Sequence, residues 1–211
     1  MRSPRGGAAK KPAQERSLHD WSNMNLRQTR KPPTTKIEIL GAALDIVREA
    51  GALSLTIDAV AERSGFSKGG VLYNFPTKDI LVVAMVQHVA DRFAVDVEER
   101  RQLYLDADSP TLAAMIDVTE RWIENELSVA RALMVANLSF PGLVAPILEL
   151  KSRLKSNIQT ETADLTGALV IWSALEGLQF SNAHCVALHT DEERLAVLAE
   201  LRRRVNVEGR R

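Results

Sequence analysis

The sequence contains little of several residue types that characterise other classes of protein. Cys185 is the one cysteine among 211 residues, so an internal disulfide is excluded, and we expect a small buried side chain in a reducing, cytoplasmic setting. Aromatic residues make up only 5% of the chain, and β-branched runs that alternate with polar residues are scarce, which argues against sheets. No stretch of about 18 uncharged apolar residues is present, so we expect no membrane span and no membrane partner.

The chain is rich instead in Ala, Leu, Val and Glu, and this composition predicts an all-α protein. Capping residues and apolar spacing predict about nine helices. They cover residues 36–50, 57–64, 68–75, 78–102, 110 to about 125, 128–138, 146–158, 163–187 and 191–204. The caps that we expect are Thr35 with Glu38, Thr56, Ser67, Thr77, Ser109 before Pro110, and Thr190 with Glu193.

A zero net charge conceals a basic N-terminus. Residues 1–36 contain nine Lys or Arg and two acids, whereas the remaining residues contain 18 bases and 25 acids. A basic arm on a mildly acidic body indicates either a polyanionic partner or a solvated tail. Residues 1–33 are rich in Pro, Gly, Ser and charge, so we predict disorder there, and Met24 is an alternative start of translation.

The segment SKGGVLYNF, residues 67–75, predicts a short helix with two adjacent glycines, Gly69 and Gly70. Such a helix is unstable alone and needs neighbouring helices to brace it. Ala61 and Gly65 precede it at the spacing that lets two helices cross and turn. This pattern is typical of a helix-turn-helix, whose second helix enters the major groove of double-stranded DNA.

The residue types around this helix suit two kinds of DNA contact. We expect Ser67 and Lys68 to reach base edges, and the glycines to let the helix approach the DNA closely. We expect the remaining polar groups to meet phosphates, namely Thr56, Tyr73, Asn74, Thr77 and Lys78. Outside such a motif, Lys68 would be read as a solvated charge and Tyr73 as a core aromatic.

The stretch ILGAALDIVREAGALSLTIDAVAERSGFSKGGVLYNFPTKDILV resembles the DNA-binding domain of the tetracycline-repressor (TetR) family of transcriptional regulators. The resemblance covers about residues 36–82. It implies that Thr56, Ser67, Lys68, Gly69, Tyr73 and Lys78 contact DNA. The family often has His at the position of Asn74 and Val at that of Phe66. The resemblance also implies a C-terminal pocket whose ligand lowers the affinity for DNA.

The C-terminal half shows no catalytic constellation, so we expect no enzyme activity, no cofactor and no metal site. His184, Cys185 and His189 lack a clean metal-binding spacing. Bulky apolar residues lie among small ones and are candidates for lining a cavity for an apolar or amphipathic ligand. They are Met115, Trp122, Met134, Phe140, Trp172 and Phe180, although each alone is typical of ordinary core.

A two-fold dimer is expected because one recognition helix reads only a few base pairs of a palindromic operator. The long apolar segment 163–187, together with the last helix, is the candidate interface. The interface residues that we expect are Leu169, Trp172, Leu175, Gly177, Leu195 and Leu198.

The sequence thus predicts a disordered basic extension (1–33), a helix-turn-helix domain (34–82) and a helical ligand-sensing and dimerisation domain (83–211). The function predicted first is a dimeric repressor that a small ligand releases from its operator. Two alternatives stay open at this point: an activator or ligand-independent DNA-binding protein of the same fold, and a helical interaction module without a DNA function. The polar residues between 56 and 78 argue against the last.

Overall fold

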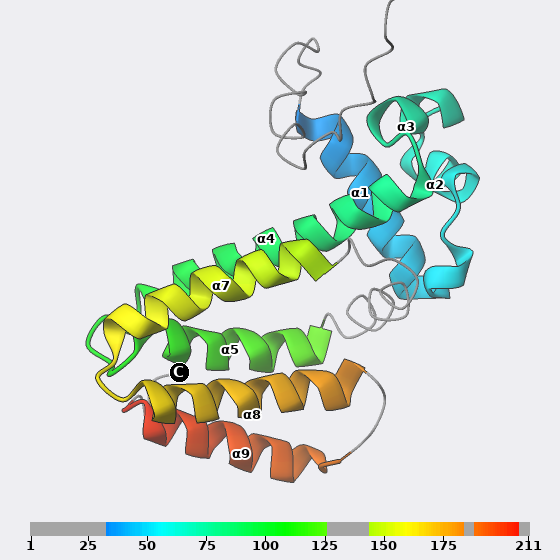
Figure 1. The fold of residues 1–211 in the computed structure, drawn as a ribbon. Helices are drawn as coiled ribbons and strands as arrows, with labels where there is room; N and C mark the ends of the chain where they lie inside the picture. Colours follow the sequence, from blue (N-terminus) through cyan, green and yellow to red (C-terminus); the bar gives the residue numbers. More distant parts are fainter. Residues whose placement is uncertain (1–32, 126–143, 184–187, 207–211) are drawn as a thin grey trace, which may run out of the picture. The chain divides into compact units, whose positions relative to one another are not determined.

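The computed structural model describes residues 33–125, 144–183 and 188–206, and within them every regular element is a helix (Figure 1). The α-helices are α1 (Pro33–Ala50), α2 (Ile57–Ser64), α3 (Lys68–Asn74), α4 (Lys78–Arg101), α5 (Pro110–Asn125), α7 (Val144–Glu161), α8 (Leu165–Ala183) and α9 (Asp191–Arg204), with one 3₁₀ turn at Ala52–Ser54. The predicted all-α fold is confirmed. The helix predicted near 128–138 lies outside the described residues.

Four of the eight described α-helices begin at a predicted cap. The side-chain oxygens of Thr56, Ser67, Thr77 and Thr190 each accept a hydrogen bond from the backbone N–H three residues later, at 3.1–3.2 Å. Glu193 returns a bond to the N–H of Thr190, at 2.8 Å, and so completes a capping box. The local sequence therefore determines where these four helices start.

The predicted cap Thr35 is wrong, whereas Ser109 precedes α5 as predicted but directs its hydroxyl to another helix. Thr35 lies inside α1, which begins earlier at Pro33, a residue whose fixed φ suits the first helical position. The hydroxyl of Ser109 donates to the Glu161 carboxylate at 3.1 Å. That carboxylate also accepts from the N–H of Thr111, at 2.8 Å, so a residue of α7 caps the start of α5.

The buried apolar side chains form two clusters. The first includes residues of α1, α2, α3 and the N-terminal half of α4, up to Val86. The second begins at Ala90 and includes residues of α4, α5, α7, α8 and α9. Because α4 contributes to both clusters, a tilt of this helix would act on both.

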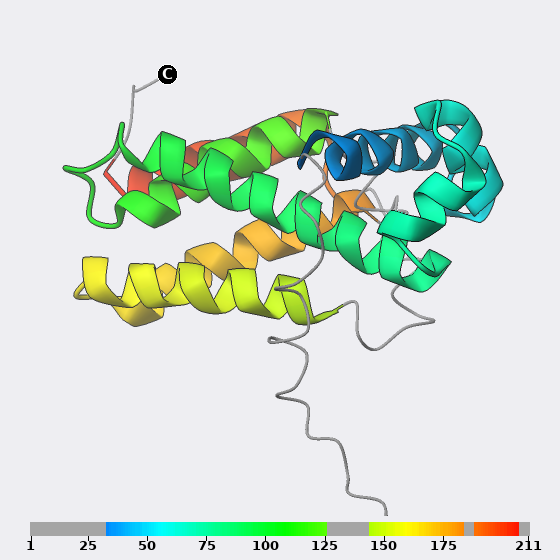
Figure 2. The ribbon, with the colours of Figure 1, turned by 90° about the horizontal axis from the view of Figure 1, so that it is seen from above.

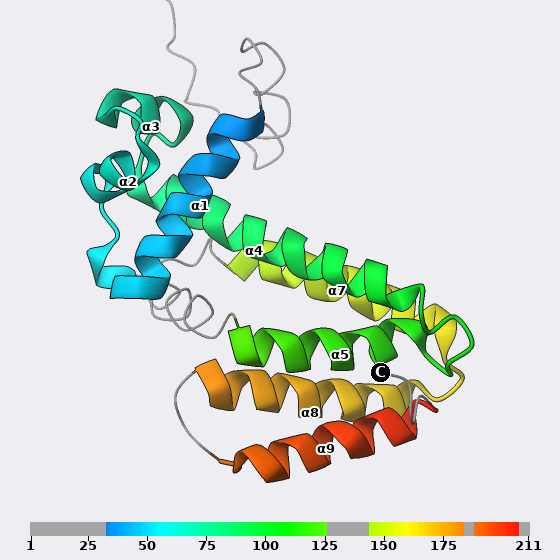
Figure 3. The ribbon, with the colours of Figure 1, turned by 180° about the vertical axis from the view of Figure 1, so that it is seen from behind.

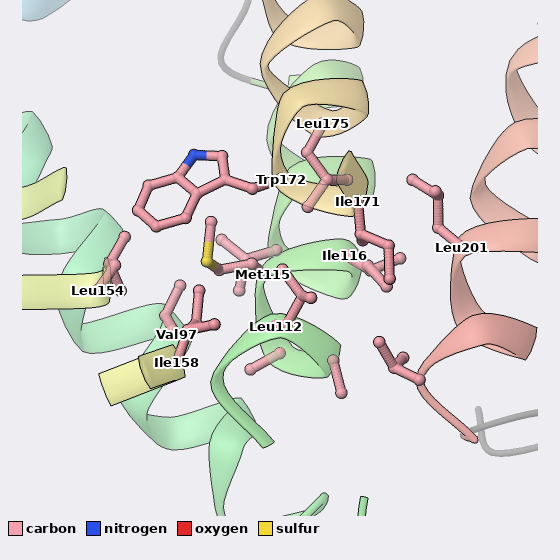
Figure 4. Close-up of a cluster of buried hydrophobic side chains, with 14 of the residues drawn as sticks. Val97, Leu112, Met115, Ile116, Leu154, Ile158, Ile171, Trp172, Leu175 and Leu201 are labelled. Carbon is pink, nitrogen blue, oxygen red and sulfur yellow. The ribbon is translucent and has the colours of Figure 1, made fainter. Parts of the chain in front are cut away.

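Helix α5 lies at the centre of the second cluster (Figures 1 and 3). It packs against α4 and α7 on one side and against α8 and α9 on the other. Seen from above, α4 and α7 run side by side (Figure 2). Figure 4 shows the side chains that meet here, among them Val97, Leu112, Met115, Ile116, Leu154, Ile158, Ile171, Trp172, Leu175 and Leu201.

Candidate nucleic-acid interface

Helices α2 and α3 are joined by a tight turn at Gly65, which adopts the left-handed conformation with φ of 74°. A residue with a β-carbon would be strained there. Val60 from α2 and Val71 from α3 are both fully buried. Phe66, which lies between them in the sequence, is half-buried. This geometry confirms the predicted helix-turn-helix and holds α3 against the first core cluster.

The outward side of α3 carries the residues predicted to face DNA. Ser67, Lys68 and Gly69 are exposed, and Tyr73 is 56% exposed. A β-carbon built on Gly69 would have only the Ser67 hydroxyl, 4.0 Å away, as a neighbour. Gly69 therefore lacks a side chain at a surface position, where its absence allows another molecule to approach the helix backbone.

Gly70 has a different environment from Gly69. A β-carbon on Gly70 would lie 3.3 Å from the Ser67 hydroxyl and 3.7 Å from the β-carbon of Phe66. The Ser67 hydroxyl is the same group that caps α3 by accepting the Gly70 N–H. The second glycine is thus explained in part by the cap, which sequence reasoning did not foresee.

Asn74 is half-buried, and its side-chain amide donates to the backbone carbonyl of Gly70 at 2.8 Å. Phosphate oxygens accept hydrogen bonds and do not donate them, so a phosphate contact needs an amide hydrogen of Asn74. One of the two hydrogens is already used within α3. The predicted phosphate contact of Asn74 therefore depends on its second amide hydrogen.

The N-termini of α2 and α4 flank the recognition helix in sequence. Their caps Thr56 and Thr77 are exposed, as is Lys78 in the first turn of α4. The free N–H groups and the dipole at a helix N-terminus favour an anion there, and Lys78 adds a positive charge. These three residues are available for the phosphate contacts predicted for them.

Two contacts near α3 were not foreseen from the sequence. Lys68 forms an ion pair with Asp58 of α2, at 2.9 Å. Arg63 of α2 pairs with Glu49 of α1, with Nη1 of the arginine 2.9 Å from a carboxylate oxygen. This hydrogen bond lowers the pKa of Glu49 and raises that of Arg63. Both contacts join residues ten or more positions apart, so no local sequence pattern predicts them.

The residues predicted to line a ligand cavity do not all come together. Met115 and Trp172 are buried in the second core cluster, where Figure 4 shows both side chains extending toward the side of Leu154. Trp122 is half-buried and donates its indole N–H to Asp96 of α4, at 2.8 Å. Phe180 is 55% exposed on α8. Met134 and Phe140 lie outside the described residues.

A groove of about 430 Å³ lies between α7 and α8, and Trp172 forms part of its wall. Glu176 accepts the indole N–H of Trp172 at 2.9 Å and pairs with Lys151. Lys155 lies one turn further along α7 and also lines the groove. Sequence reasoning selected the tryptophan but missed the two lysines.

The candidate dimer residues divide between the inside and the outside of one chain. Leu175 and Leu198 are only 1% and 0% exposed, and Trp172 is also buried, so these three do not present surface to a second chain. Gly177 and Leu195 are exposed, and Leu169 is half-buried. The exposed face of α8 is uncharged and consists of Thr166, Val170, Ser173, Gly177 and Phe180.

The C-terminal end of α4 is tied to the helices around it. The carboxylate of Glu161, whose side chain is 9% exposed, accepts the Arg101 Nε–H at 2.8 Å and both donors of Thr111 at 2.8 Å. Near the middle of α4, burial lowers the pKa of His88, and the neighbouring Arg92 lowers it further. The end of α4 furthest from α3 is therefore held by a partly buried ionic network.

Two kinds of feature are absent from the part of the chain that the structure describes. None of its helices combines the length and the apolar content needed to cross a membrane. Nor do three or more His, Cys, Asp or Glu side chains gather there in a way that suits a metal ion.

Comparison with known proteins gives two matches to one family. The sequence model described as "Bacterial regulatory proteins, tetR family" matches residues 39–85. The model described as "Tetracyclin repressor-like, C-terminal domain" matches residues 109–206. Together they account for more than half of the chain and include all the predicted DNA-contacting residues.

Individual relatives are also transcriptional regulators, a class of protein distinct from enzymes. The chain is 30% identical over 146 residues to the HTH-type transcriptional regulator RutR of Escherichia coli K12, a match that covers 67% of this chain and 65% of the relative. The chain thus spans slightly less than two thirds of the length of this relative.

Solved structures share the fold at low sequence identity. The protein SCO7518 of Streptomyces coelicolor A3(2) superposes with a TM-score of 0.64 at 19% identity, covering 82% of this chain and 99% of that one. The multidrug binding protein EbrR, complexed with malachite green, superposes with a TM-score of 0.63 at 23% identity, covering 82% and 99%. By its two family matches and its helix-turn-helix, this chain belongs to the tetR family of bacterial regulatory proteins.

Proposed function

We propose that this chain is a sequence-specific DNA-binding transcriptional regulator that acts as a homodimer on a palindromic operator. The observation that carries the proposal is the outward face of α3, which lies within the segment matched by the tetR-family model. Buried Val71 and Phe75 hold this short helix on the core, while Ser67, Lys68 and Tyr73 remain exposed. A helix presented in this way fits the major groove.

The exposed residues divide into two proposed roles. Lys68 and Ser67 read base edges, because an ammonium donates to guanine acceptors and a hydroxyl pairs with several bases. Thr56, Thr77 and Lys78 bind phosphates and so position the protein without reading sequence. Tyr73 contributes its phenol to a phosphate, and Asn74 adds its remaining amide hydrogen.

Dimerisation is proposed through the exposed face of α8 together with α9. Val170 and Phe180 are more than half exposed on α8, and Leu195 is 48% exposed on α9. Gly177 lies between the two α8 residues, and nothing lies within 4 Å of a β-carbon built there, so a partner helix has room to approach. A two-fold pair of chains would place two α3 helices on half-sites about 34–36 Å apart.

Regulation by a small molecule is proposed through α4. The two core clusters meet along this helix, which supports a DNA-binding part at 34–82 and a sensing part at 83–211. EbrR, a structural neighbour, was crystallised with small molecules such as malachite green. For this chain we propose an apolar or amphipathic effector that favours one tilt of α4, lowers DNA affinity and relieves repression. Such an effector acts only through its differential affinity for the two states.

DNA selection from a random library, followed by binding titrations at several salt concentrations, tests the proposal. Wild-type protein is expected to enrich a palindromic sequence. Lys78→Ala should weaken all DNA roughly equally and lower the salt slope by about 1, whereas Lys68→Ala should change the enriched sequence. Binding without sequence preference at physiological salt would refute the proposed function.

A further inference from the structure

The one ion pair that the structure shows for Lys68 joins the two helices of the helix-turn-helix. The Lys68 ammonium lies 2.9 Å from one carboxylate oxygen of Asp58 and 3.0 Å from the other. Lys68 is the first residue of α3, and Asp58 lies in the first turn of α2. The contact spans ten residues, so it exists only because the turn at Gly65 brings the two helices together.

This pair contributes little to the stability of the fold. The side chains of Lys68 and Asp58 are 60% and 72% exposed, and ion pairs with such exposure are screened by water and salt. The packing of α2 on α3 depends instead on Val60 and Val71, which are fully buried. A substitution of Asp58 therefore removes the negative charge beside Lys68 and releases its ammonium, while the helices remain packed.

The carboxylate has two effects on the lysine. It offsets the charge of Lys68, so that this residue attracts the DNA backbone less, whatever the base sequence. It also restricts an ammonium that would otherwise rotate freely on a four-carbon stem. Since backbone attraction drives non-specific binding and base contacts create specificity, both effects raise the ratio of specific to non-specific affinity.

We propose that Asp58 is a specificity-determining residue, which acts by holding Lys68 for base contact and suppressing its attraction to phosphates. The inference rests on the DNA-binding function proposed above and names a residue that makes no base contact of its own. Its effect is conditional on Lys68, which separates it from a general effect of negative charge near DNA.

Asp79 provides a matched control on the same chain. It lies two residues after Thr77, the cap of α4, just as Asp58 lies two residues after Thr56, the cap of α2. Both aspartates are exposed at the start of a helix proposed to meet phosphate. The two aspartates differ in one respect: among the contacts that the structure describes, Asp58 forms an ion pair with a lysine and Asp79 does not.

The experiment compares full-length wild type, Asp58→Asn, Asp79→Asn and Asp58→Glu on the DNA that wild type enriches and on a scrambled duplex. Both asparagine variants should bind scrambled DNA more tightly and steepen the salt slope by up to about 1. Asp58→Asn alone should lower the specific-to-non-specific ratio, by about threefold or more, and broaden the enriched sequence. Asp58→Glu, which keeps the carboxylate, should recover most of the ratio.

The dependence on Lys68 is tested in a Lys68→Met background. There, Asp58→Asn should leave the remaining sequence preference unchanged, because the residue through which it acts is absent. The inference is overturned if Asp58→Asn and Asp79→Asn alter the ratio equally, or if Asp58→Asn acts equally in both backgrounds. If wild type enriches no sequence at all, the proposed function itself fails, which is a different result. Circular dichroism melts confirm that each variant is folded.

Discussion

Gly69 offers a test in which stability and DNA binding are expected to change in opposite directions. The residue lies in the first turn of α3 on its exposed side, and its backbone has no positive φ. A β-carbon there meets no atom closer than 4.0 Å. The substitution Gly69→Ala therefore adds a methyl group to the free protein without strain, at the surface proposed to approach DNA.

The two effects have different sizes. Alanine in place of glycine stabilises a helix by about 0.5–1 kcal/mol. For a chain of this length, that corresponds to a rise in melting temperature of about 1–4 °C. On DNA, a methyl group in a close contact costs about 1–3 kcal/mol, as it does in an overpacked core. The expected loss of affinity is then roughly five- to 150-fold.

Thermal denaturation and titration with the enriched DNA measure the two effects, and Gly41→Ala provides the control. Gly41 lies inside α1, outside the proposed DNA-contacting residues, and a β-carbon there also meets nothing within 4 Å. Gly41→Ala should raise the melting temperature similarly and leave the affinity for DNA unchanged. A Gly69→Ala variant that melts below wild type, or binds DNA within twofold of it, would refute the reasoning.

Three more expectations concern residues of the helices that form the second cluster and of the segment that joins α4 to α5. Glu161→Gln should lower the free energy of unfolding in urea by about 1.5–3 kcal/mol, because its buried carboxylate accepts four hydrogen bonds. Exposed Glu98→Gln should cost less than about 0.5 kcal/mol, and equal losses would count against this network. Burial and the hydrogen bond to Asp117 raise the pKa of Tyr104 from 10.0 to about 12. The folded state therefore keeps this proton longer than the unfolded state, and stability should fall between pH 10 and 12, less so in Tyr104→Phe. A pH profile shared by wild type and Tyr104→Phe would contradict that assignment. Phe180→Glu should leave the chain folded but yield monomers in sedimentation analysis, and an intact dimer would exclude this face of α8.

Local signals predicted the helix starts and the helix-turn-helix well. Thr56, Ser67 and Thr77 each bond to a backbone N–H three residues away, so the partners of each cap lie in the same short stretch of sequence. Gly65 takes a conformation that few other residues tolerate, so its position in the turn could also be predicted from the sequence. The same short segments determine which α3 residues are candidates for DNA contact.

The orientation of α8 could not be predicted in the same way. Apart from Glu176, this helix has no charged residue, so its apolar pattern does not distinguish an inner face from an outer one. Packing against α5 determines which face of α8 is buried: Leu175 is buried in the chain, whereas Phe180 is exposed. The candidate interface accordingly moves from the buried leucines to the exposed face of α8.

The amino-acid sequence alone is enough to establish the helical class, most helix boundaries and the recognition helix, because each depends on groups a few residues apart. The capping of α5 by Glu161 and the pairing of Lys68 with Asp58 depend on groups 50 and ten residues apart. Such contacts form only when helices pack, and packing depends on the shape and burial of whole elements. The tertiary structure therefore decides how the candidate DNA-binding residues are oriented and constrained.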